Sequence, residues 1–167
     1  MLAFARQARL LDPAEVDRLE RRAQADERAA SAATRAARSL REALYGIFSA
    51  QAHGRAVPDR DLEGLNEALG EVLPNLRLDP RGASLAWGWR RDGDALTRPL
   101  WSIARAAAEL LTREPSAPVR ECGGTECTWL FLDHSRGRSR RWCSMASCGN
   151  REKARRHYRR TRDQAPL

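Results

Sequence analysis

Four cysteines in the last third of this 167-residue chain limit its possible folds more than any other feature. They form two C-x4-C pairs, Cys122 with Cys127 and Cys143 with Cys148, and fifteen residues separate the pairs. Two thiols on one tight turn chelate a single metal ion, and two such turns complete a tetrahedral set of four sulfur ligands. The pattern therefore predicts one metal site that is closed by all four cysteines.

The identity of the metal follows from the ligand type and the compartment. No apolar run is long enough to span a bilayer, and residues Met1 to Arg6 lack the apolar core and cleavage site of a secretory signal. We therefore expect a soluble cytoplasmic protein, in which thiols stay reduced and four thiolates select zinc first and an iron–sulfur cluster second. Four unliganded thiols, or two disulfides, fit paired short spacings less well. His134 is a weaker ligand candidate, because four sulfurs already close the site.

Positive charge is concentrated in the same region. The chain carries a net charge of +8; residues 118–167 hold 12 basic and 5 acidic side chains, whereas residues 1–117 hold 18 and 17. Such asymmetry indicates that the C-terminal part faces a polyanion. Lys153 is the only lysine, so the basic side chains are almost all arginine. Guanidinium groups suit two-point contacts with phosphate and guanine, although a GC-rich genome produces the same bias.

A basic helix is predicted to follow the last cysteine, with Asn150 as its N-cap. Arg151, Arg155, Tyr158, Arg159 and Arg162 fall on one side of this helix at steps of three and four residues. A solvated charged face is the alternative, but so many arginines with few acidic neighbours favour phosphate contact. The candidate nucleic-acid contacts lie in the loop between the cysteine pairs and on the helix: Arg136, Arg138, Arg140, Arg141, Arg151, Lys153, Arg155 and Arg159.

The cysteine-containing segment is about fifty residues long and cannot build a large core, so we expect zinc to supply most of its folding free energy. Trp129 and Phe131 are candidates for stacking on a base, but packing in a small apolar floor is the preferred interpretation for both. Asp133 is expected to orient the segment by accepting hydrogen bonds from the backbone or from Arg141. Four protein ligands leave no zinc-bound water to activate, so hydrolytic chemistry is not expected. The predicted floor consists of Trp129, Leu130, Phe131, Leu132 and Trp142.

The N-terminal part is predicted to be dominated by helices. Asp12-Pro13-Ala14-Glu15 has an N-cap, a proline at the first helical position and the closing glutamate of a capping box. This helix leads, with or without a break near Gln24, into an alanine-rich helix from about Asp26 to Gln51. The further expected elements are a helix over 59–73, strands at 76–78 and 85–89 around a turn at 79–82, a turn at 92–94, a helix over 100–111 and a linker at 114–118.

These elements define a mostly α chain with a small β-hairpin, divided into a helical domain at 1–115 and a four-cysteine module at 119–162. Trp87, Trp89 and Trp101 are candidates for lining a ligand pocket, although filling the core is the commoner role of aromatic residues. The sequence has no recognisable phosphate-binding loop and no catalytic triad. We therefore do not expect an enzyme.

The C-terminal segment resembles the CGNR zinc finger, a family named for the tetrapeptide that stands here as Cys148-Gly149-Asn150-Arg151. The resemblance covers residues 119–160. It rests on the four cysteines, on the stretch from Trp129 to Ser135 and on the stretch from Arg141 to Met145. It implies a zinc-stabilised module of treble-clef-like or ribbon-like form.

Residues 8–115 resemble the helical ABATE domain, which precedes this finger in the family and is assigned to stress-induced transcription regulation. The resemblance rests on the helix order, on Asn66 in the third helix and on the tryptophan hairpin. Family members carry a longer segment before the Leu11-Asp12-Pro13 stretch. We therefore expect this chain to be shortened there and to lack a sheet edge or part of a ligand pocket.

The resemblance implies a bacterial transcription regulator whose finger contacts DNA. We expect the N-terminal domain to sense a small molecule or to form a homodimer, and we expect no membrane partner. Three competing hypotheses remain open. The module could bind RNA, dock an acidic protein partner, or act as a thiol redox sensor that releases zinc on oxidation.

Overall fold

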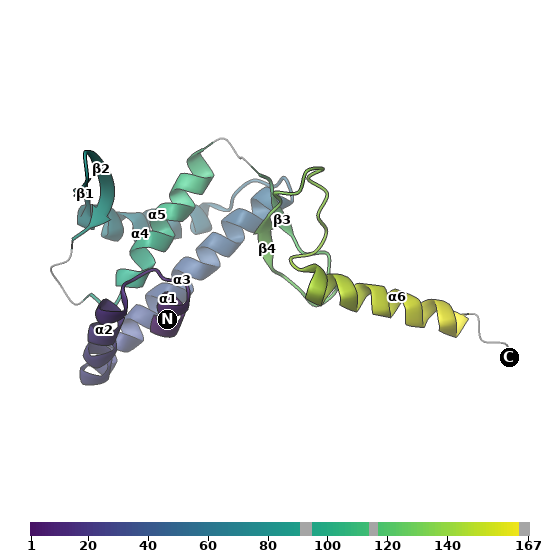
Figure 1. Ribbon diagram of the computed structural model, residues 1–167, viewed down its shortest axis with the longest axis horizontal. Coiled ribbons are helices and arrows are strands. Elements are labelled where there is room, and N and C mark those ends of the chain that lie inside the picture. Colours follow the sequence, from purple (N-terminus) through teal and green to yellow (C-terminus); the bar gives the residue numbers. More distant parts are fainter. Residues whose placement is uncertain (91–94, 114–116, 164–167) are drawn as a thin grey trace. The chain divides into compact units, whose positions relative to one another are not determined.

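The computed structural model describes residues 1–90, 95–113 and 117–163 (Figure 1). This part of the chain is mostly helical with two small antiparallel sheets, as predicted, and each of its helices is too short or too polar to cross a membrane. The turn predicted at 92–94 and most of the linker predicted at 114–118 lie outside the described residues. In chain order the elements are α1 (Leu2–Gln7), α2 (Pro13–Ala25), α3 (Glu27–Ala52), α4 (Asp59–Val72), η1 (Leu73–Asn75), β1 (Leu76–Arg81), β2 (Ser84–Trp89), α5 (Arg98–Thr112), β3 (Val119–Glu121), β4 (Leu130–Leu132), η2 (Met145–Gly149) and α6 (Asn150–Asp163).

The chain divides into two compact units. The helical unit comprises Met1–Leu44 and Asp59–Arg113, and the cysteine unit comprises Tyr45–Pro58 and Glu114–Leu167. The C-terminal end of α3 therefore belongs to the cysteine unit, although it lies more than sixty residues before the first strand of that unit. The sequence-based division into 1–115 and 119–162 stays a prediction.

The first helices of the helical unit share one small core. Asp12 caps α2, because its carboxylate accepts a hydrogen bond of 2.8 Å from the N–H of Glu15, with Pro13 at the first helical position. This start directs Val16 and Leu19 inward, where both are fully buried. Helix α1, which was not expected from the sequence, adds the fully buried Ala5 to this core. The cluster consists of Ala5, Leu11, Val16, Leu19, Ala33 and Leu96.

Asp26 separates α2 from α3. The two helices are therefore not continuous, a question that the sequence left open. Its φ of −141° and ψ of 85° are not helical, and its carboxylate accepts a hydrogen bond of 2.9 Å from the N–H of Ala29. Asp26 therefore serves as the N-cap of α3. The helix ends before His53-Gly54, as predicted, with Gly54 in the left-handed region at a φ of 61°.

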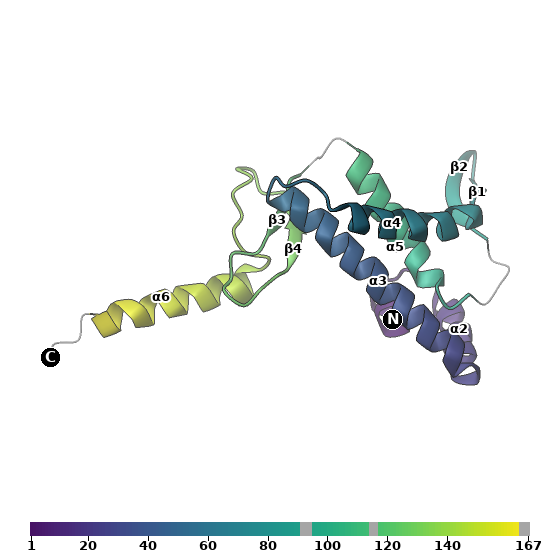
Figure 2. The same ribbon diagram turned by 180° about the vertical axis from the view of Figure 1, so that it is seen from behind.

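Helices α4 and α5 pack together in the helical unit (Figure 2). Leu65 and Val72 are buried on α4, whereas Leu62 on the same helix and Leu73, the first residue of η1, are exposed. Gly64 allows a close approach to α3, because a Cβ added there would come within 3.2 Å of the Ala43 Cβ.

The hairpin β1–β2 is longer than predicted, and its turn lies further along the chain. The register pairs Leu76 with Trp89 and Arg81 with Ser84, so the connection is the two-residue loop 82–83 instead of residues 79–82. Gly82 has a φ of 61°, which suits the first central position of a tight hairpin turn. Pro80 remains within the strand because a two-stranded sheet has open edges, where a missing N–H breaks no ladder bond.

Candidate metal centre

The first cysteine pair lies in the loop between β3 and β4. These strands pair antiparallel, with Glu121 opposite Leu130, so the loop begins and ends at fixed points. The N–H of Cys122 donates a hydrogen bond of 2.9 Å to the carbonyl of Trp129, and the N–H of Cys127 donates one of 3.0 Å to that of Gly124. These bonds hold both thiols on the same side of the loop.

The second cysteine pair lies at the start of the C-terminal helix. Cys143 precedes η2, and Cys148 lies within this element, which leads directly into α6. The N–H of Gly149 bonds to the carbonyl of Ser144, five residues earlier, as in the wide turn of a π-helix. The prediction that Asn150 is an N-cap was therefore wrong: it has helical dihedrals, and its side chain donates to the carbonyl of Ala146.

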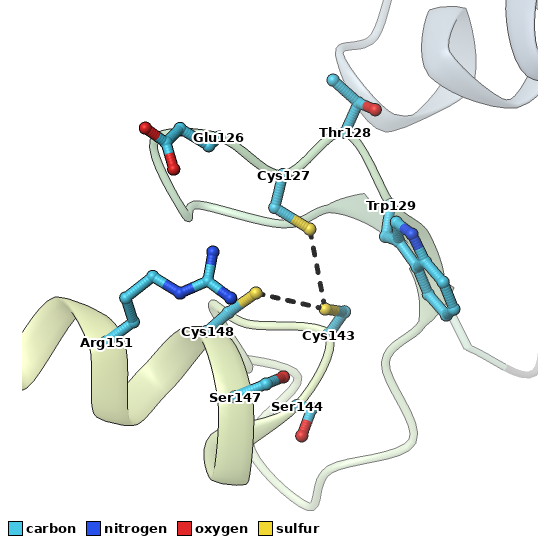
Figure 3. Close-up of a pocket in the computed structure, with 9 residues that line it drawn as sticks. All are labelled: Glu126, Cys127, Thr128, Trp129, Cys143, Ser144, Ser147, Cys148 and Arg151. Carbon is cyan, nitrogen blue, oxygen red and sulfur yellow. Dashed lines mark hydrogen bonds between the residues drawn. The ribbon is translucent and has the colours of Figure 1, made fainter.

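The four thiols converge on one point, and Figure 3 draws three of them, those of Cys127, Cys143 and Cys148. Their sulfur atoms all lie within 4.8 Å of one another, with Cys127 to Cys143 at 3.8 Å and Cys143 to Cys148 at 3.7 Å. A tetrahedral ion with zinc–sulfur bonds of about 2.3 Å requires sulfur separations of about 3.8 Å. The spacing and the all-sulfur donor set therefore fit zinc. Among the described residues, the metal-binding group contains these four cysteines and not His134.

The thiols of the cluster differ in how readily they ionise. Burial opposes ionisation of Cys122, yet the backbone N–H groups of Cys143 and Gly124 lower its pKa to about 7. Burial and the neighbouring thiols of Cys148 and Cys122 raise the pKa of Cys143 to about 12. Four thiolates at this separation would repel one another strongly, and a dication at their centre removes this cost.

A second polar centre holds the loop between the cysteine pairs. Asp133 is buried, and its carboxylate accepts hydrogen bonds from the hydroxyl and N–H of Ser135 (2.6 and 3.0 Å), the N–H of Arg140 (2.9 Å) and the Nε of Arg120 (3.0 Å). The backbone donors are as expected, but the arginine is Arg120 and not Arg141. Burial raises the pKa of Asp133, and the hydrogen bonds from Ser135, Arg140 and Arg120 outweigh this effect and lower it to about 2.

Two of the predicted nucleic-acid contacts make bonds within the cysteine unit. Arg155 lies 3.2 Å from a carboxylate oxygen of Glu126 and 3.2 Å from one of Glu152, and it also donates to the Thr125 hydroxyl. It thus joins α6 to the first cysteine loop. Arg140 donates to the carbonyls of Trp142 and Cys143 and lies over the ring of Phe131 at 4.7 Å.

The other predicted contacts are exposed. In the loop these are Arg136, Arg138 and Arg141, and on the helix they are Arg151, Lys153 and Arg159. Sequence reasoning missed Arg120, Thr125 and Glu126 as structural residues. The spacing of Glu152 and Arg155, three residues apart on a helix, was the one available signal for this network.

The aromatic residues differ in burial. The packing predicted for Trp129 was wrong, because 71% of this residue is exposed. Trp142 is half-buried, and Arg141 lies over its ring at 5.2 Å.

In the helical unit, Trp101 is buried and Trp89 partly buried, with ring centroids 5.7 Å apart. The guanidinium of Arg98 lies over both rings, and Trp87 is exposed, with Arg105 over its ring. The ligand pocket predicted for these three tryptophans stays a prediction.

Two family models match this chain. The CGNR zinc finger matches residues 119–161, which contain the four-thiol cluster, and ABATE, described as "Putative stress-induced transcription regulator", matches residues 1–114. The second match covers more than half of the chain, so the protein belongs to the ABATE family, and its C-terminal part is a CGNR zinc finger. Neither family is described as an enzyme. Among curated proteins, none matches the sequence.

We expect Cys143→Ser to lose the metal. Serine is a poor zinc ligand, and the metal-binding free energy of a small four-thiolate module is largely its folding free energy. Zinc content should fall from about one ion per chain to near zero. The fall is measured by elemental analysis after dialysis against a mild chelator. Ser144→Ala, one residue away and outside the thiol cluster, is the matched control and should keep its zinc; equal zinc content in both variants would contradict the assignment.

We expect Asp133→Asn to change the acid sensitivity of the cysteine unit. The folded-state pKa lies below the unfolded value of about 4, so the carboxylate stabilises the fold above pH 4, and this stabilisation is lost as the pH falls toward 2. At neutral pH the variant should lower the melting temperature by about 4 °C or more. The difference between wild type and variant should shrink on acidification. Equal melting temperatures of the zinc-loaded wild type and variant at neutral pH would refute the role of this carboxylate.

Proposed function

We propose that the protein is a transcription regulator that contacts DNA through its cysteine unit. The observation that carries this proposal is the attachment of a strongly basic helix to the metal centre. Residues 150–163 contain seven basic and two acidic side chains, and Cys148, at the helix start, is one of the four converging thiols. A metal-anchored helix presents its charges in fixed positions, as recognition of a regular phosphate backbone requires.

The loop between the cysteine pairs supports the same proposal. The hydrogen bonds of Asp133 hold its start, and Arg136, Arg138 and Arg141 are exposed along it. Arg138 has a left-handed φ of 46°, and its N–H bonds to the carbonyl of Ser135 at 3.0 Å, so the loop is tightly turned. The basic side chains of the loop are thus displayed on a defined backbone.

Arg155 and Arg140 make bonds within the unit, and this reduces the number of basic residues that we expect to contact phosphate. Their guanidinium groups are engaged with protein carboxylates and carbonyls, so we assign both to holding the unit together. We propose that phosphate contacts come from the exposed group: Arg136, Arg138, Arg141, Arg151, Lys153 and Arg159.

The test of this function is Arg159→Ala. If Arg159 contacts a phosphate, its loss should weaken duplex binding and reduce the slope of log K against log salt by about one. The measurement is fluorescence anisotropy of the zinc-loaded protein with a labelled duplex at several salt concentrations. Sequencing of duplexes retained from a random pool then shows whether a base sequence is recognised.

The matched control is Arg35→Ala, which removes an exposed arginine from α3 in the helical unit. It should leave the slope unchanged. Identical slopes for the two variants would exclude Arg159 as a phosphate contact. Absence of DNA binding by the wild-type protein would overturn the proposal and direct attention to RNA or an acidic protein. Zinc loss with mild peroxide, reversed by reductant, would instead favour a redox sensor.

A second proposal concerns self-association of the helical unit. Directly opposed residues on β1 and β2 give the hairpin one entirely apolar face, made by the pairs Leu76–Trp89, Leu78–Trp87 and Pro80–Leu85. Leu78, Leu85 and Trp87 on this face are 52%, 65% and 58% exposed. Contiguous exposed apolar surface of this kind marks interaction sites, and a two-fold homodimer covers the same face on both copies.

We expect Leu85→Glu to dissociate this homodimer, because it places a charge in the apolar face. Light scattering during size exclusion should give the mass of one 18.8 kDa chain for the variant and twice that mass for the wild type. Ser84→Glu adds the same charge one residue away, on the opposite face of the hairpin, and should remain dimeric. A wild-type protein that is monomeric at all concentrations would refute the proposal.

A further inference from the structure

Trp129 exposes a large aromatic surface next to the metal centre. It is 71% exposed, more than any other tryptophan among the exposed large residues of the described chain. Burial of a tryptophan is normally favourable, so an indole held in water is expected to have a partner that covers it.

The position of Trp129 is fixed by the backbone around it. Its carbonyl accepts a hydrogen bond of 2.9 Å from the N–H of Cys122, and the next residue, Leu130, pairs with Glu121 in the β3–β4 sheet. The residue therefore lies between a metal ligand and a paired strand, both of which restrain it. A segment whose backbone is already fixed loses little backbone freedom when a flat ligand stacks on its side chain.

The surroundings of the ring are polar and basic. Trp129 borders an open hollow at the thiol cluster, and this hollow is also lined by Ser144, Ser147 and Arg151 (Figure 3). Glu126 lies there too, but its carboxylate pairs with Arg155 at 3.2 Å. An apolar protein patch would leave these hydroxyls and this guanidinium without partners. A nucleotide has an apolar base face, polar base edges and an anionic phosphate, and so complements all three kinds of group.

A second exposed aromatic residue lies further along the same helix. Tyr158 is 74% exposed and follows Arg151 by seven residues, or two helical turns, which places both on one side of α6. Arg162 occupies the same side. Alternation of aromatic rings with cationic side chains is typical of surfaces that follow a single strand of nucleic acid.

We propose that Trp129 is a stacking platform for an unpaired base of DNA, with the adjoining phosphates directed toward Arg151. Base faces are hidden in a duplex, so this contact requires a melted, flipped or single-stranded site. The inference rests on the proposed DNA-binding function and adds the kind of DNA that is bound most tightly.

The test compares Trp129→Ala, Trp129→Phe and Phe4→Ala in the full-length zinc-loaded protein. Phe4→Ala is the matched control, because it removes an aromatic side chain that is 58% exposed in the helical unit. The probes are a labelled oligothymidine of about 20 nucleotides, a duplex of the same length and an oligouridine of the same length. Trp129→Ala should weaken oligothymidine binding about five- to 150-fold, with duplex binding changed less than about twofold. Trp129→Phe should retain most of the affinity, and Phe4→Ala should retain all of it.

Tryptophan fluorescence gives a second readout that does not depend on an alanine variant folding correctly. Stacking on Trp129 should quench emission when oligothymidine is added to the wild-type protein, and this quench should be absent in Trp129→Phe. Equal quenching in both proteins, or equal loss of duplex and single-strand binding in Trp129→Ala with zinc retained, would overturn the inference.

The remaining outcomes separate this inference from the proposed function. If the wild type and Trp129→Ala bind both DNA probes equally well, the stacking inference fails and the proposed function stands. If the wild type binds neither DNA probe, the proposed function fails and the inference fails with it. Tighter, Trp129-dependent binding of oligouridine would overturn the choice of DNA.

Discussion

Convergence of four thiols on one point takes the place of a hydrophobic core in the C-terminal part of this protein. Among the described residues from 117 to 163, the buried ones are Ala117, Cys122, Asp133, Cys148 and Gly149. None is a large apolar side chain, so the burial of apolar surface that stabilises ordinary domains contributes little within these residues; the buried Ile47 of the same unit belongs to the end of α3. The remaining stabilising free energy must come from metal coordination and from the hydrogen bonds of Asp133. Both form only when the loops that carry the cysteines and the hydrogen-bond donors are correctly placed.

The features that sequence reasoning predicted well are those decided within a few residues. The C-x4-C spacing is sufficient to place two thiols on one turn, and Asp12-Pro13 specifies a helix start without help from distant parts of the chain. The end of α3 at His53-Gly54 is equally local. From these local patterns the fold class was predicted correctly, and the four cysteines predicted as metal ligands lie together in the structure.

The features that sequence reasoning missed depend on contacts between distant residues or on competing local signals. Arg120 is the partner of Asp133 because β3 and β4 pair, which the sequence of either strand alone does not reveal. Asn150 has the chemistry of an N-cap, but the turn through Cys148 had already started the helix. Pro80 and Gly82 both favour a turn, and the register of the hairpin places the turn at Gly82. The charge pattern of the sequence identifies the basic side chains, but it does not show which of them bond to other residues of the protein.

The assignment of Tyr45–Pro58 to the cysteine unit limits the modularity of the zinc finger. His53, just beyond the end of α3, faces Glu121 of β3 at 3.6 Å, and its Nδ1 lies 2.8 Å from the Ser49 carbonyl. A fragment that begins at Val119 would lack this neighbour. A finger that is exchanged between proteins, in the laboratory or in evolution, keeps this contact only if the end of α3 is exchanged with it.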